Sequence, residues 1–116
     1  MKKIALFLFS LLFLNCSNDS ESDLTDPQDT PKTYTNYVKG VIDGNCISCH
    51  GNTPTNGAPM SLTTYNNVKS AIETRGLIDR ISRSQGTAGM MPNGGTRLPQ
   101  TTIDNIIAWR DANFPE

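Results

Sequence analysis

Histidine, cysteine and tryptophan are scarce in this chain. Its 116 residues include one histidine, three cysteines and one tryptophan. Because His50 is the single histidine, a histidine-rich cluster is excluded, and a cysteine–histidine catalytic pair could only involve His50. A structural zinc site needs four ligands. Cys46, Cys49 and His50 supply three, and the remaining cysteine, Cys16, lies near the start of the chain.

Long apolar runs are also scarce. The one such run, from Ile4 to Leu14, follows Lys2 and Lys3. A basic start followed by roughly 7–15 apolar residues is typical of a secretory signal. The run is shorter than the about 20 residues that a membrane-spanning helix needs. We therefore predict an exported protein in which no other segment crosses a membrane.

No small-x-small cleavage site follows this run, and Cys16 stands directly after it in the segment Phe13-Leu14-Asn15-Cys16. That segment resembles a bacterial lipobox, although Asn15 and Phe13 stand where a small residue and a leucine are usual. The resemblance implies a lipoprotein signal peptide over residues 1–15 and acylation of Cys16. An unlipidated, leftover cysteine is the alternative.

The segment after Cys16 has little apolar surface. Residues 17–31 contain five acidic side chains, two prolines and one aliphatic side chain, that of Leu24. Such a composition buries too little surface to offset the entropy of ordering. We expect residues 16–32 to form a lipidated, disordered acidic tether, and residues 33–116 to form the folded domain.

The expected domain lacks an excess of charge of either sign. It carries seven basic and six acidic side chains, a net of +1, so it offers no clearly basic face for nucleic acid. It is also poor in large apolar residues. A domain this short commonly needs a disulfide, a metal or another added element to complete its core.

Apolar periodicity predicts helices, and no segment alternates convincingly enough to be a strand. The first helix carries an apolar stripe from Tyr34 to Ile42, with Thr33 as its N-cap. The second spans Tyr65 to about Gly76 and continues briefly through Leu77 to Ile81. The third begins after Pro99, with Thr101 and Asp104 in a box-like N-terminal pattern and Asn113 at its left-handed end. We therefore predict an all-α fold of three to four helices joined by long loops.

The segment Cys46-Ile47-Ser48-Cys49-His50 has the C-x-x-C-H spacing of a covalent haem attachment site. At the end of a helix, side chains three residues apart share a face. Two thiols so spaced can reach the two vinyl groups of one porphyrin, which leaves the next residue, His50, to bind the iron. A Cys46–Cys49 disulfide in a thioredoxin-like site is less consistent with a chain that shows no βαβ units.

From about Tyr34 to Glu116 the chain resembles a monohaem class I-type cytochrome c domain, of the short kind found in bacterial exported proteins. The features that match are, in order, C-x-x-C-H-Gly after the first helix, Leu62-Thr63-Thr64-Tyr65 with Val68, Met91-Pro92 in a glycine-rich loop with Leu98, and a terminal helix with Ile103, Ile106 and Trp109. The resemblance implies a cytochrome c-like fold wrapped around one covalent haem c. In the family, a methionine next to proline supplies the sixth iron ligand.

Carried to this sequence, the resemblance makes Met91 the distal iron ligand opposite His50. Met90 would ligate instead if the loop register slipped by one residue, and Met60 is a third thioether, expected mainly to fill a gap beside the haem. A large apolar porphyrin would also supply the burial that the domain lacks. We expect its walls to be Ile47, Met60, Leu62, Tyr65, Ile81 and Leu98. Candidate partners for the haem propionates are Arg80, Arg83 and Arg97, each of which is equally ordinary as a surface arginine.

Gly40 interrupts the first predicted helix, where glycine costs about 1 kcal/mol against alanine. A glycine at this position is useful if a bulky partner must approach the backbone closely. Trp109 is the single tryptophan, and the first and last helices cross in cytochromes of this type. We therefore expect Gly40 and Trp109 to lie in contact.

The predicted function is electron transfer by an Fe(II)/Fe(III) haem, in a protein tethered by lipid to the outer membrane, on its periplasmic face or at the cell surface. Its partners would be redox proteins, namely a dehydrogenase, a reductase or another cytochrome. One alternative is a peroxidase-like haem enzyme or gas sensor with an open distal site. Another is an accessory module of a larger redox complex.

If Cys16 is the acylated N-terminus, Cys16→Ser should move the protein from the membrane fraction to the soluble fraction. The physical reason is that several acyl chains anchor a protein stably in a membrane. The serine variant would carry no acyl chain. Fractionation of cells followed by intact mass spectrometry measures both the location and the mass of the mature chain. A wild-type protein with a free Cys16 thiol, or one cut at another position, contradicts the prediction.

Overall fold

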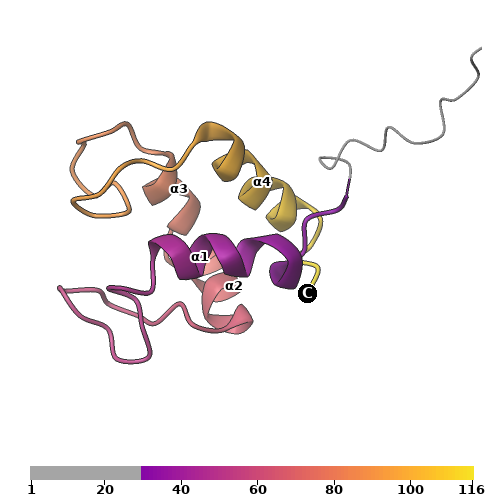
Figure 1. The fold of residues 1–116 in the computed structure, drawn as a ribbon, viewed down its shortest axis with the longest axis horizontal. Helices are drawn as coiled ribbons and strands as arrows, with labels where there is room; N and C mark the ends of the chain where they lie inside the picture. Colours follow the sequence, from indigo (N-terminus) through magenta and orange to yellow (C-terminus); the bar gives the residue numbers. More distant parts are fainter. Residues whose placement is uncertain (1–29) are drawn as a thin grey trace, which may run out of the picture.

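The computed structural model describes residues 30–116, and every regular element within them is helical (Figure 1). The elements are a π-helical turn η1 (Tyr34–Val38) and the helices α1 (Lys39–Asn45), α2 (Tyr65–Thr74), α3 (Leu77–Ser82) and α4 (Gln100–Asp111). The described part of the chain is therefore all-α, as predicted. The expected signal peptide, Cys16 and residues 17–29 of the expected tether lie outside the described residues. Between residues 30 and 116, no helix combines the length and the apolar character needed to cross a membrane.

The first predicted helix is present, but its first turn is wider than an α-helical turn. Thr33 caps it as predicted: the Thr33 hydroxyl accepts a hydrogen bond from the Asn36 amide N–H at 3.2 Å, and the Thr33 N–H donates to the Asn36 side-chain oxygen at 2.8 Å. This reciprocal pair is a capping box. The π-helical turn η1 then passes directly into α1, which ends at Asn45.

The second predicted helix is divided in two. Thr64 caps α2 by accepting a hydrogen bond from the Asn67 N–H at 3.2 Å. Gly76 has a φ of +67°, a left-handed conformation that glycine adopts without the steric penalty of a side chain. The chain changes direction there, and α3 begins at the next residue.

The predicted start of the last helix is wrong in its capping residues. Helix α4 begins at Gln100 with Pro99 as its N-cap, and no side chain caps it. Thr101 therefore lies inside the first turn, where it cannot cap, and Gln100 donates to Asp104 at 2.8 Å. The predicted end is confirmed, because Asn113 follows the helix with a left-handed φ of 64°.

The core gathers around Trp109, whose exposed fraction is 0%. Its ring centroid lies 6.1 Å from that of Tyr34, 6.0 Å from that of Tyr65 and 5.0 Å from that of Phe114. The Trp109 indole N–H donates to the carbonyl of Pro115 at 2.7 Å. One aromatic cluster thus joins η1, α2, α4 and the C-terminal residues.

The expected contact between Gly40 and Trp109 is wrong. Gly40 is exposed, and a side chain added there would meet no atom within 4 Å. The buried residues Tyr34, Val38 and Ile42 recur every four positions, so Gly40, two positions off that stripe, lies on the opposite face. The last helix instead meets the first segment at Tyr34 and through a hydrogen bond from Asn105 to the Tyr37 hydroxyl at 3.1 Å.

Two long loops, 46–64 and 83–99, leave the helices at the same end of the molecule, away from the C-terminus (Figure 1). Each follows a helix and returns to the next one. The first loop carries Cys46, Cys49, His50 and Met60, and the second carries Met90 and Met91.

Trp109→Ala should lower the free energy of unfolding by about 3–5 kcal/mol, because it removes a fully buried aromatic side chain from the centre of the core. Gly40→Ala is the matched control. It should leave the stability unchanged or raise it by up to about 1 kcal/mol, since Gly40 is an exposed helical position with open space around it. Denaturant unfolding followed by circular dichroism measures both. A Gly40→Ala variant less stable than Trp109→Ala would contradict this account of the core.

Candidate functional site

A pocket of about 650 Å³ opens between the loops 46–64 and 83–99, helix α3 and Arg75, the C-cap of α2. Its volume lies in the range of about 300–1,000 Å³ that is usual for small-molecule and cofactor sites. Cys46, Cys49, His50 and Met91 all line it. The pocket therefore brings together the side chains that the sequence singled out, although His50 and Met91 are 41 residues apart.

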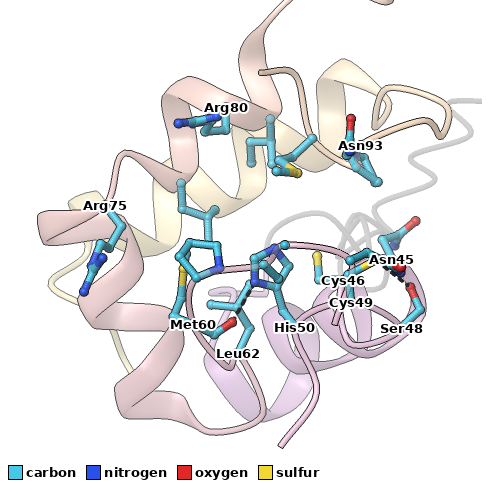
Figure 2. A pocket seen from close by; sticks show the side chains of 18 residues that line it. Asn45, Cys46, Ser48, Cys49, His50, Met60, Leu62, Arg75, Arg80 and Asn93 are labelled. Carbon is cyan, nitrogen blue, oxygen red and sulfur yellow. Dashed lines mark hydrogen bonds between the residues drawn. The ribbon is translucent and has the colours of Figure 1, made fainter. Parts of the chain in front are cut away.

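The cysteines belong to a turn that ends α1. Cys46 is the C-cap of that helix, and its carbonyl accepts hydrogen bonds from the N–H groups of Cys49 at 3.2 Å and of His50 at 2.9 Å. This turn brings both thiols and the imidazole to the pocket, with the two cysteines next to each other (Figure 2). Cys46 and Cys49 are free thiols and form no disulfide with each other.

The Cys46 thiol is a poor candidate for a catalytic nucleophile. Burial raises the pKa of Cys46 to about 11, so the thiol is protonated at neutral pH. A reactive cysteine needs a low pKa and a partly exposed, electropositive surrounding.

His50 is nearly buried, with an exposed fraction of 8%. Its Nδ1 atom lies 2.8 Å from the carbonyl oxygen of Met60 (Figure 2). A carbonyl can only accept, so Nδ1 must carry the proton and donate it. In the neutral imidazole, Nε2 then keeps its lone pair, which is the arrangement of a histidine that binds a metal.

Met91 reaches the pocket from a loop that is held tightly to α3. The Met91 N–H donates to the Arg80 carbonyl at 3.1 Å. The Arg83 guanidinium donates to the carbonyl of Ala88 at 2.8 Å, and the Arg97 guanidinium donates to that of Arg83 at 3.0 Å. Between these points Gly89 has a φ of +75° and lies against the guanidinium groups of Arg80 and Arg83, where a side chain would collide. The backbone that presents Met91 is therefore fixed from both sides.

The other two thioethers have different surroundings. Met90 is 5% exposed and lines a separate hollow of about 260 Å³ in the glycine-rich loop, not the main pocket. Met60 does line the main pocket, but its carbonyl is bonded to His50, so it belongs to the same wall as the imidazole. In Figure 2, Asn93, which follows Met91 by two residues, lies across the pocket from His50, whereas Met60 lies beside it.

The expected walls are present only in part. Met60, Leu62 and Ile81 line the pocket, while Ile47, Tyr65 and Leu98 do not. Tyr65 is instead part of the Trp109 cluster, and its hydroxyl donates to the Phe114 carbonyl at 2.8 Å. Leu77 and Pro92 take places in the lining that the sequence did not assign to them.

The arginines at the pocket also differ from those expected. Arg80 lines it, as predicted, but Arg83 and Arg97 do not, and Arg75 does. Arg83 is paired with Asp79 at 2.7 Å, and Arg97 donates to the Gln100 side chain at 2.7 Å. The guanidinium groups of these two arginines are therefore already bonded to other groups of the protein. Some of these bonds fix the loop that carries Met91.

Besides Leu77 and Pro92, two polar contributors to the site were not identified from the sequence. One is the Met60 carbonyl, which has no sequence signal because every residue carries one. The other is Arg75, whose position at the C-cap of α2, just before Gly76, could have marked it as lying where the chain turns. Between residues 30 and 116, no three His, Cys, Asp or Glu side chains converge to hold a metal ion.

Comparison of the chain with protein-family models, with curated proteins and with solved structures found no match.

Proposed function

We propose that this protein is a c-type cytochrome that transfers single electrons, with one haem joined to Cys46 and Cys49. The observation that carries the proposal is the convergence in one pocket of two neighbouring thiols, an imidazole with Nε2 free to bind, and a thioether from a separate loop. The donor set, the volume and the apolar lining fit a porphyrin. The folded domain would then be cytochrome c-like, consistent with the all-α architecture.

Each of these side chains has a defined task in the proposal. The Cys46 and Cys49 thiols form thioether bonds with the vinyl groups, which requires no catalytic thiolate in the finished protein. His50 would hold the iron through Nε2, and its hydrogen bond to the Met60 carbonyl would orient the ring. Met91, from the other loop, would be the second iron ligand. When bound, the haem supplies a one-electron Fe(II)/Fe(III) couple, whose potential is raised by histidine–methionine ligation.

The electron-carrier proposal is favoured over a haem enzyme by the chemistry of the pocket lining. Among the described residues that line it, His50 is the one histidine, and none is an aspartate or a glutamate. An enzyme that splits peroxide would need a group for acid–base work on the distal side. With Met91 as a ligand, the iron has no open position. The partners would be redox proteins that approach the haem edge through a small transient interface.

The same proposal places the protein outside the cytoplasm. The apolar run from Ile4 to Leu14 and the cysteine after it support export and lipidation at Cys16. The acidic segment that follows would act as a tether, which lets the domain reach partners while it remains attached to the outer membrane. Covalent haem attachment to exported chains is consistent with this location.

The covalent attachment is tested directly by electrophoresis. Under denaturing conditions, haem staining should remain on the band of the wild-type protein, because thioether bonds survive unfolding. The double variant Cys46→Ala/Cys49→Ala should lose the stain, and Cys16→Ser should keep it as a matched control. Extraction of the haem from the wild-type protein by acidified organic solvent would refute covalent attachment.

The distal ligand is tested by the two neighbouring methionines. Met91→Ala should abolish the weak near-infrared charge-transfer band of the ferric protein and allow carbon monoxide to bind the ferrous form. Met90→Ala should leave both properties nearly unchanged, because Met90 faces a different hollow. The opposite pattern would make Met90 the ligand. Immediate binding of carbon monoxide by the wild-type protein would favour a sensor or peroxidase over a carrier.

A further inference from the structure

We propose that Arg75 and Arg80 bind the two propionate groups of the haem, at the edge of the pocket opposite Cys46 and Cys49. This inference rests on the proposed function and assigns two side chains that complete the same site.

The charge of the pocket is unbalanced. Among the described residues that line it, Arg75 and Arg80 are the two charged side chains, and none is acidic. Two positive charges at one pocket without a negative partner repel each other and attract an anion. A ligand with two carboxylates supplies the missing charge in matching number.

The arginines at the pocket differ from the other arginines of the described chain. Arg83 pairs with Asp79 at 2.7 Å, and Arg110 pairs with Asp111 at 2.8 Å. Arg97 donates to the side chain of Gln100 and to neighbouring carbonyls. By contrast, the Arg75 guanidinium has no hydrogen-bond or ion-pair partner among residues 30–116. Arg80 has one long bond, at 3.4 Å, to the Gly89 carbonyl.

Each guanidinium has five N–H donors in a fork that matches a carboxylate. Arg80 uses one of its donors and Arg75 uses none within the described residues, so both retain the capacity for a two-pronged bond. Both residues are exposed. Their head groups lie at the mouth of the pocket, where a carboxylate can be bound without the cost of burying it completely.

The positions also match the shape of the cofactor. A haem carries its two vinyl groups toward one edge of the ring and its two propionates at the opposite edge. In Figure 2, Cys46 and Cys49 lie at one side of the pocket, and Arg75 and Arg80 lie at the other, with His50 between them. A ring whose vinyl groups meet the thiols therefore directs its carboxylates toward the arginines.

The test uses the intact holoprotein and the propionate bending modes in its resonance Raman spectrum, whose frequency falls when hydrogen bonds to the carboxylates are lost. Arg75→Gln and Arg80→Gln should each lower the frequency of a propionate mode. Each should also lower the reduction potential, because a positive charge near the iron disfavours the ferric state. Arg110→Gln, which removes an arginine paired elsewhere, is the control and should change neither property.

Two further measurements distinguish the possible failures. Arg80 also bonds to the loop that carries Met91, so the Arg80 variants are used only if they keep the near-infrared band. Arg75 makes no bond to that loop, so Arg75→Gln reports on the propionates alone. If a Gln variant fails to mature, Arg75→Lys and Arg80→Lys retain the charge but not the fork. They should then keep the potential and still shift the Raman mode. Haem-loaded variants with unchanged propionate modes would overturn the propionate assignment while leaving the cytochrome proposal intact. A wild-type protein without haem would overturn both.

Discussion

The burial of one indole ring, that of Trp109, is the constraint on which the described structure depends. The rings of Tyr34, Tyr65 and Phe114 surround it, and they come from the first helical turn, α2 and the C-terminal residues. Burying Trp109 therefore brings both ends of the described region together. With the helices joined at that end, the two long loops are left at the other, and they face each other across the pocket.

The scarcity of large apolar side chains is reflected in the structure, in which a small core lies next to an open pocket. The aromatic cluster and the buried aliphatic residues form one continuous core. Three members of that core, Leu62, Leu77 and Ile81, also line the pocket of about 650 Å³. A small domain gains limited burial from its own chain. A porphyrin in this pocket would add the apolar contact that the sequence does not provide, so the proposed cofactor would contribute to stability as well as to function.

The two walls of the pocket are held by backbone hydrogen bonds. On one wall the Met60 carbonyl orients His50, and on the other the Arg80 carbonyl accepts a bond from the Met91 N–H. Side chains held in this manner lose little further freedom when they bind a ligand. Such an arrangement suits a carrier of single electrons, in which no group has to enter or leave the site during a cycle. In the loop that carries Met91, Gly89 has a φ of +75°, a conformation that glycine adopts without the penalty of a side chain.

Local features of the chain were predictable from sequence because they depend on neighbours in the chain. The helical periodicity, the Thr33 cap, the left-handed Asn113 and the adjacency of Cys46, Cys49 and His50 are of this kind. Features that depend on packing between distant segments were not predictable. The sequence does not show that Gly40 faces away from Trp109, and it favoured Met91 over Met90 only through the resemblance to a known family. It also does not distinguish Arg75, which has no partner within the described chain, from Arg83 and Arg97, which are engaged by nearby side chains and carbonyls.

The spacing of the motif by itself determined the candidate chemistry, because three residues in one turn need no tertiary contact to meet. Only the tertiary structure decided which thioether and which charges join them, because those groups reach the pocket from loops whose course is set by the packing of the helices.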